Sequence, residues 1–156
     1  MYTEIPITEL VKFQPKELKD YAVSDSDYMD YCYETGCTLS GGFILFGGWL
    51  KVFPGDILGD GIKREAYCAM GGLGISVYHD TGRFMCSNGG CPSRKWWTPH
   101  YVYYHTASVM AYAASEANPE GAIIFFDKHS NIIAAVKPDT SRSPFIGGGT
   151  VNWEKA

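Results

Sequence analysis

The sequence predicts a single α+β domain over residues 1–156, with a mostly antiparallel twisted sheet covered by N-terminal helices and by a helix at about residues 106–117. Short aromatic and β-branched runs broken by glycine fill residues 41–91, which is typical of strands in a meander. Helix signals lie on both sides of that stretch. The chain is also long enough to bury about two-thirds of the surface that its unfolded form would expose.

The first elements are an extended segment and a short helix. Residues 1–14 alternate apolar and polar side chains, which predicts an extended arm or an edge strand with Pro6 on its solvent side. A short helix over residues 15–22 follows. It begins with a proline, which is tolerated at the first helical position because the missing N–H would have no partner there.

A second helix is expected to begin at Ser24 or Ser26 and to end at Gly36. The serine oxygens would cap its first turn, and neighbouring aspartates would favour the positive end of its dipole. If Gly36 adopts the left-handed conformation after the last turn, Cys32 and Cys37 are the pair that makes an apolar contact in a Schellman ending.

The central stretch reads as an antiparallel meander. The expected strands are residues 41–48 and 49–54, as one kinked strand or two consecutive ones, then 66–70, 74–80 and 83–86. Turns are expected at Pro54-Gly55-Asp56 and at Asp80-Thr81-Gly82, because these residue types favour turn conformations.

The last part of the chain carries one helix signal and one hairpin signal. The alanine-rich residues 106–117 have a cap near Thr106 or Ser108 and a stop at Asn118-Pro119, which predicts the helix. Two apolar runs, 121–127 and 132–138, flank a polar four-residue connection and predict a hairpin. The glycine-rich tail is expected to be loosely ordered.

Net charge, hydropathy and cysteine count indicate which classes of partner and which compartment to expect. Thirteen basic and seventeen acidic residues give a formal net charge of −4, which argues against a nucleic-acid partner and favours a basic protein or a neutral small ligand. No apolar run spans a bilayer and no signal peptide is recognisable, so we expect no membrane partner and a cytoplasmic location. An odd number of cysteines fits a reducing compartment, and no motif implies a cofactor.

An acidic and aromatic group of residues is the leading candidate for a partner-binding surface. Carboxylates would attract a basic partner, while aromatic rings supply the buried area that anchors an interface. The alternative is that the aspartates only cap helices and solvate loops. The candidate residues are Asp25, Asp27, Tyr28, Asp30, Tyr31, Trp49, Asp56 and Asp60.

Two other kinds of site remain open from the cysteines and histidines. A small enzyme could pair Cys68 or Cys86 as nucleophile with His79 or His105 as base, although core packing explains the thiols equally. A zinc-stabilised interaction module would use four thiolates. Its ligands would be Cys32, Cys37, Cys86 and Cys91, whose four-residue spacings are wide for such a site.

The order of these patterns resembles a known group of proteins. A proline-started helix pair precedes Gly41-Gly42, an apolar strand ends at Phe53-Pro54, and residues 71–78 (GGLGISVY) come before the helix expected at 106–117. This order is similar to that of the SUKH superfamily and of the GAD-like bacterial immunity proteins. The resemblance implies a small acidic α+β protein of the cytoplasm that blocks a toxin or effector domain and performs no catalysis.

Overall fold

The computed structural model of the chain describes residues 3–6, 31–56, 58–74, 76–87, 99–112, 122–129, 132–140 and 145–156. These residues form nine strands and one short helix, α2 (Pro99–His105). The strands are β1 (Thr3–Pro6), β2 (Tyr31–Ile44), β3 (Gly47–Pro54), β4 (Arg64–Gly74), β5 (Tyr78–Ser87), β6 (Thr106–Tyr112), β7 (Ala122–Asp127), β8 (Ile132–Pro138) and β9 (Phe145–Lys155).

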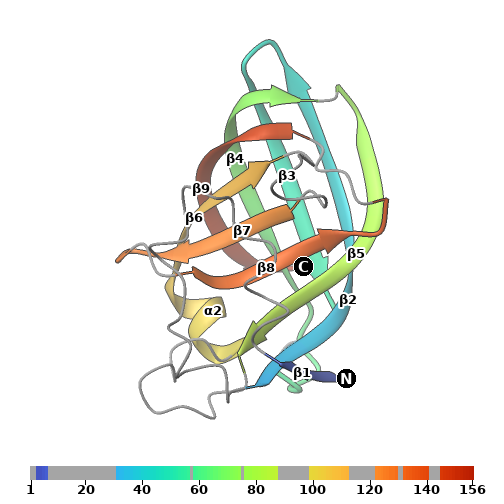
Figure 1. Ribbon diagram of the computed structural model, residues 1–156, viewed down its shortest axis with the longest axis vertical. Coiled ribbons are helices and arrows are strands. Elements are labelled where there is room, and N and C mark those ends of the chain that lie inside the picture. Colours follow the sequence, from blue (N-terminus) through green and yellow to red (C-terminus); the bar gives the residue numbers. More distant parts are fainter. Residues whose placement is uncertain are drawn as a thin grey trace.

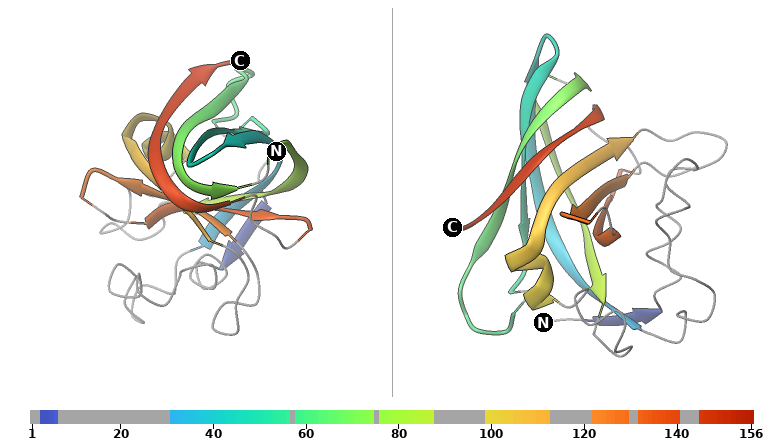
Figure 2. Two further views of the ribbon diagram at one scale, coloured as in Figure 1. Left: turned by 90° about the horizontal axis from the view of Figure 1, so that it is seen from above. Right: turned by 90° about the vertical axis from the view of Figure 1, so that its left-hand side faces the viewer.

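Eight of these strands close into an antiparallel barrel (Figure 1). Their order is β2-β3-β4-β9-β6-β7-β8-β5, and β5 pairs back onto β2 to complete the ring. The view from above shows this ring directly (Figure 2, left). The ninth strand, β1, pairs with the first residues of β2, so the expectation of a strand near the N-terminus is confirmed for Thr3–Pro6.

The barrel wall follows from a period of two in the sequence. In β3, Leu50, Val52 and Pro54 are buried, whereas the side chains between them are partly exposed. Successive side chains of a strand point to opposite faces, so the buried set lines the barrel interior. The same alternation in β2 places Leu39 and Phe43 inside.

The hairpin of β7 and β8 is the element that the sequence predicts best. The two strands pair antiparallel from Ile123–Val136 to Phe126–Ile132. Both inward-facing and outward-facing side chains of this hairpin are buried. That explains why its strands read as continuous apolar runs and not as alternating ones.

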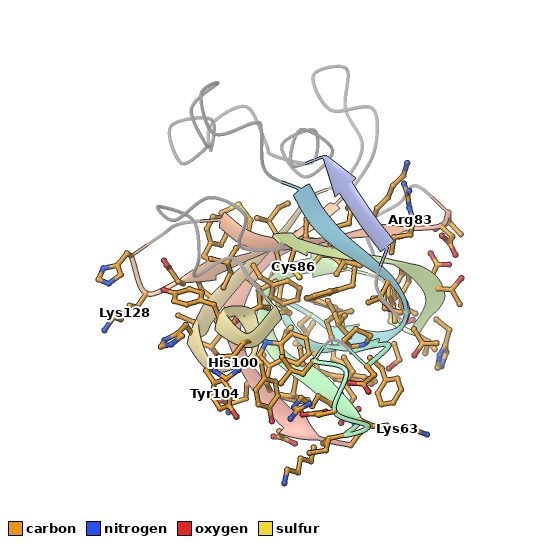
Figure 3. All side chains as sticks on the ribbon, turned by 90° about the horizontal axis from the view of Figure 1, so that it is seen from below. Lys63, Arg83, Cys86, His100, Tyr104 and Lys128 are labelled. Carbon is orange, nitrogen blue, oxygen red and sulfur yellow. The ribbon has the colours of Figure 1, made fainter. Side chains whose placement is uncertain are left out.

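Side chains fill the interior of the barrel. The ring of Phe84 meets the ring of Trp153 edge-on with centroids 5.8 Å apart, and it lies 6.1 Å from the ring of Phe125. The edge-on arrangement of Phe84 and Trp153 is one of the geometries that aromatic pairs prefer, while the Phe84 and Phe125 rings are tilted at 49° to each other. Helix α2 lies over the lower end of the barrel (Figures 1 and 3) and extends the cluster, since the Tyr103 ring lies 6.1 Å from that of Trp153.

Glycine in β9 allows β4 and β9 to come close together. A Cβ atom at Gly149 would collide with the carbonyl oxygen of Ala69, and one at Gly147 would collide with that of Gly71. The strands are paired along the whole of β4, from Arg64 to Gly74. The run of glycines is therefore required by the sheet, and the expectation of a loosely ordered tail is wrong.

The predicted α+β class is wrong, because the described chain is a barrel of strands and not a sheet covered by helices. The helix expected at 106–117 is strand β6 over Thr106–Tyr112, and residues 113–117 lie outside the described chain. Pairing with both β7 and β9 satisfies the backbone of β6, while Val109 and Ala111 are buried. These contacts outweigh the helix propensity of an alanine-rich segment.

The helix expected to end at Gly36 is also wrong over its described part, because Tyr31–Ile44 is a single strand. Gly36 pairs with Arg83 inside the sheet, so no Schellman ending joins Cys32 to Cys37. The helix expected over residues 15–22 lies outside the described chain.

Asp80-Thr81-Gly82, expected to form a turn, lies within the continuous strand β5. The pairing of β5 with β2 holds these residues extended. Within the described residues, no helix is both long and apolar enough to cross a bilayer.

Candidate binding surface

A hollow of about 360 Å³ lies on the outer face of the barrel, across β5, β2, β3 and β4. We call it the outer hollow. Its residues are Thr38, Leu39, Ser40, Lys51, Phe53, Glu65, His79 and Asp80. They come from four strands that follow one another in the sequence, and the pairing of β5 with β2 brings the last of them beside the first.

Strand register brings the polar residues of the outer hollow into one row. Ser40 lies opposite Lys51 in the β2–β3 pair and opposite His79 in the β2–β5 pair. Lys51 in turn lies opposite Tyr67 in the β3–β4 pair. Directly opposed residues share a face of the sheet, so the four side chains run across the outside of the wall.

One lysine and two carboxylates line the outer hollow. Lys51 Nζ lies 4.0 Å from Glu65 Oε1, and it also lies 5.7 Å from the centroid of the Trp49 ring. The Lys51 side chain is 42% exposed, so water weakens both interactions. The surface therefore offers Lys51 as a cation, Glu65 and Asp80 as carboxylates, and neighbouring hydroxyl groups to a partner.

Asp80 is held in place by hydrogen bonds. The Thr140 hydroxyl donates to Asp80 Oδ2 at 2.7 Å, the Tyr78 hydroxyl donates to the same oxygen at 3.2 Å, and the Thr81 N–H donates to Oδ1 at 2.8 Å. Partial burial opposes ionisation of Asp80, but the hydrogen bonds from Thr140 and Thr81 outweigh it and lower its pKa. Asp80 thus stays ionised and joins the residues after β8 to β5.

The structure places three of the predicted partner-binding residues, and they do not form one surface. Trp49 is half-buried on the outer face of β3, at the margin of the outer hollow. Asp56 accepts the N–H groups of Asp60 and Gly61 and so shapes the loop after β3. Asp60 is paired with Arg64.

For the other predicted residues the structure gives no side-chain position. Asp25, Asp27, Tyr28 and Asp30 lie outside the described residues. Tyr31 begins β2, and only its backbone is described. The part of the predicted surface that these five residues would form therefore stays a prediction, whereas Trp49, Asp56 and Asp60 have definite places.

Arg64 pairs with Asp60 at the lower end of the barrel, where it packs against helix α2. Arg64 is 6% exposed, and its guanidinium lies 4.3 Å from the Tyr103 ring. The hydrogen bond from this guanidinium lowers the pKa of Asp60 to about 2. Asp60 therefore serves as the counter-ion of a buried arginine.

The proposed cysteine–histidine pairs are not supported by the geometry. Cys68 is fully buried, and burial raises the pKa of its thiol to about 12. Cys86 is 1% exposed, while His79 and His105 are exposed. The His105 ring stacks on the Tyr101 ring at 4.3 Å, at the end of α2. A thiolate is the nucleophile in such enzymes, and burial suppresses the thiolate of Cys68.

The expected zinc ligands are only partly described. Cys37 lies opposite Gly82 and Cys86 lies opposite Tyr33, so the two thiols are at different levels of the same strand pair. Burial, followed by the negative charges of Asp139 and Asp80, raises the pKa of Cys37 to about 12. No cluster of three or more potential metal ligands occurs among the described residues. The side chains of Cys32 and Cys91 lie outside them.

Sequence reasoning missed most of the outer hollow. Lys51 and Phe53 alternate with buried residues of β3, and that period of two was a usable signal for an exposed face. Thr38, Ser40 and Glu65 carry no motif. They join the surface only through the register of β2, β3 and β4.

No protein-family model matches the sequence, and no curated protein matches it. Among solved structures, the chain is similar to the virulence-associated protein VapD from the intracellular pathogen Rhodococcus equi. The TM-score is 0.57 and the identity 21%, over 79% of this chain and 98% of that chain. At this identity the likeness shows the fold alone, so the chain shares its overall fold with VapD.

Proposed function

We propose that the chain is a non-catalytic binding protein that docks a protein partner on the outer face of β5, β2, β3 and β4. One observation carries the proposal. Phe53 is partly exposed in the outer hollow and Tyr67 is 38% exposed beside it, whereas buried side chains such as Phe84 and Phe125 occupy the barrel interior.

The chemistry of this face suits a protein partner. Aromatic residues are enriched among the anchors of interfaces, and polar groups around them form the hydrogen bonds of the rim. Here Phe53 and Tyr67 would supply the anchoring area, while Lys51, Glu65 and Ser40 would supply the polar groups. The volume of about 360 Å³ is near the lower end for small-molecule pockets, which favours a protruding side chain of a partner.

The partner class we propose is a toxin or effector domain met in the cytoplasm, which the chain would inhibit as immunity proteins do. The formal net charge of −4 favours a basic partner. The resemblance to the SUKH and GAD-like proteins supplies the toxin as candidate. Because the α+β fold implied by that resemblance is wrong, the exposed surface carries more of the proposal than the resemblance does.

Matched variants test the docking face. Phe53→Ala and Tyr67→Ala remove its two anchors, whereas Tyr104→Ala removes an aromatic side chain that is 59% exposed on α2, at the lower end of the barrel. Candidate partners are the products of the neighbouring genes, and affinity is measured by titration calorimetry. We expect each face variant to weaken binding by about tenfold or more and the α2 variant to change it by less than about twofold.

Two results would overturn this proposal. One is the absence of a stoichiometric complex with every neighbouring gene product. The other is a complex that the face variants and the α2 variant weaken equally, because the binding surface would then lie elsewhere on the molecule.

A further inference from the structure

The connection between β2 and β3 ends in a projecting apolar tip. Ile44, Leu45 and Phe46 are 82%, 83% and 74% exposed, and we call these three residues the hairpin tip. Figure 1 shows this hairpin rising above the other strands at the top of the barrel. Val77, between β4 and β5, is also 70% exposed. Contiguous exposed apolar side chains of this size mark interaction sites.

The backbone of the hairpin tip is strained at Leu45, a non-glycine residue with a positive φ. Leu45 has φ of 58°, a region that tight hairpin turns normally fill with glycine, asparagine or aspartate. The tip is also braced, because the Gly72 N–H donates a hydrogen bond to the Phe46 carbonyl at 2.9 Å. A strained residue that the surrounding structure holds in place points to function.

Among the described residues, the strand segments that surround the hairpin tip carry no charged side chain. The sequence has no Asp, Glu, Lys, Arg or His within residues 41–50, 66–78 or 145–153. These stretches include the upper parts of β2, β3, β4 and β9, which are neighbours in the barrel. Figure 3, a view from the lower end of the barrel, labels three of the charged side chains that lie outside these stretches, Lys63, Arg83 and Lys128.

Trp49 and Lys51 are the first residues below the tip that carry polar side-chain groups on β3. Counting pairs from the turn, Gly42–Trp49 is the third and Ser40–Lys51 the fifth. A rise of about 3.3 Å per residue puts Trp49 roughly 7–10 Å below the tip and Lys51 roughly 13–15 Å below it. Tryptophan is enriched at the headgroup level of membranes, and lysine extends its ammonium to that level from nearby.

We propose that this end of the barrel inserts its hairpin tip into the interface of an electrically neutral phospholipid bilayer. The tip would reach the acyl boundary, with Trp49 among the headgroups and Lys51 in water. Interfacial segments bury about 5–10 Å into this boundary, which matches the spacing between the tip and Trp49. The sequence predicted no membrane partner because it has no spanning run, but a shallow contact needs none.

A bilayer fits this end better than a protein partner does. Stable protein interfaces surround their apolar centre with a polar rim, often including charged groups. No such rim is available here for the first four residue pairs of the hairpin, from Ile44–Gly47 to Gly41–Leu50. The described residues around the tip include no cation that would attract anionic lipid, so the proposal is for a neutral bilayer.

Vesicle co-sedimentation tests the proposal with the intact protein and phosphatidylcholine vesicles. We expect the wild-type protein to sediment with the vesicles and Leu45→Gly and Phe46→Ser each to lower the partition coefficient by about tenfold or more, the factor gained by burying one such side chain. Leu45→Gly is informative because glycine relieves the positive φ, so its melting temperature should not fall.

Matched controls define the specificity. Ile62→Ser removes an apolar side chain that is 37% exposed in the loop between β3 and β4, at the other end of the barrel, and we expect less than a twofold change. Raising the salt from about 0.1 to about 1 M should not weaken binding, because no ion pair contributes to it. Quenching of tryptophan fluorescence by brominated lipid should decrease in Trp49→Phe.

Several outcomes would overturn the proposal. They are no sedimentation of the wild-type protein, binding only to anionic vesicles, or binding that Leu45→Gly and Phe46→Ser leave unchanged. Loss of a protein complex in the tip variants, without any vesicle binding, would also overturn it and assign the tip to a protein interface. The test is independent of the docking face, whose variants are Phe53→Ala and Tyr67→Ala.

Discussion

Arg64 and Asp60 form a two-pronged ion pair at the lower end of the barrel, with Nη1–Oδ1 and Nη2–Oδ2 distances of 2.9 and 2.8 Å. The two partners differ in burial, since Arg64 is 6% exposed and Asp60 is exposed. The pair is therefore asymmetric. Losing Asp60 leaves a buried cation without a counter-ion, whereas losing Arg64 leaves a carboxylate that water solvates.

We predict that Asp60→Asn destabilises the protein near neutral pH and that this effect fades in acid. The hydrogen bond from Arg64 lowers the pKa of Asp60 to about 2 from its usual 3.8. The stability that the ionised carboxylate contributes is therefore complete above about pH 4 and is lost as the pH falls towards 2. Urea unfolding of both proteins between pH 7 and pH 2 measures the difference. A difference in unfolding free energy that stays constant over this range would contradict the ion pair.

The aromatic cluster of the barrel predicts a large cavity effect at Phe84. This side chain is 1% exposed and lies against Trp153 and Phe125. Phe84→Ala should lower the free energy of unfolding by about 3–5 kcal/mol. Phe84→Leu, which keeps most of the volume, should cost less than about 2 kcal/mol. Chemical denaturation compares the two, and equal losses would mean that the cluster does not pack as described.

Gly149 and Gly36 both lie in strands but differ in the space available for a Cβ atom, so their alanine variants can be compared directly. Gly149→Ala would place a methyl group on the carbonyl oxygen of Ala69, so we expect a loss of at least about 3 kcal/mol or failure to fold. Gly36→Ala meets nothing within 4 Å and needs no unusual backbone angle. It should change stability by less than about 1 kcal/mol, since alanine is at least as favourable as glycine in a strand. Similar losses in the two variants, measured by thermal unfolding, would contradict the tight β4–β9 pairing.

Thiol labelling distinguishes a binding protein from a cysteine enzyme. Cys37, Cys68 and Cys86 are buried, and burial raises the pKa of Cys37 and Cys68 to about 12. Alkylation of these three residues at neutral pH should therefore be slow in the folded protein and fast in urea. Peptide mass spectrometry resolves the individual rates. Rapid labelling of Cys68 or Cys86 in the folded state would restore the catalytic reading.

Local patterns predicted some strands and failed where pairing with distant residues decides the structure. The β7–β8 hairpin is correct because its two apolar runs and polar connection lie within seventeen consecutive residues, Ala122 to Pro138. Strand β6 was predicted as a helix because the partners that hold it extended, β7 and β9, are not visible in its own sequence. Helix propensity is a weak preference that such contacts override.

The candidate surface shows the same limit. Trp49 was predicted from its residue type, and the alternation of β3 could have added Lys51 and Phe53. His79 was singled out as a possible base, but it belongs to the outer hollow because β5 closes the barrel against β2. No local motif encodes that closure. The pairing of Asp60 with Arg64, only four residues away, was not predicted, because Arg64 becomes buried solely through the fold.

Strand β9 runs from Phe145 to Lys155 and lies between β4 and β6 in the ring. The barrel therefore closes only when β9 has paired with both β4 and β6. Before then, β4 and β6 each present an open edge to other chains. Any substitution that loosens β9 would therefore expose the edges of both β4 and β6 and favour edge-to-edge association between molecules.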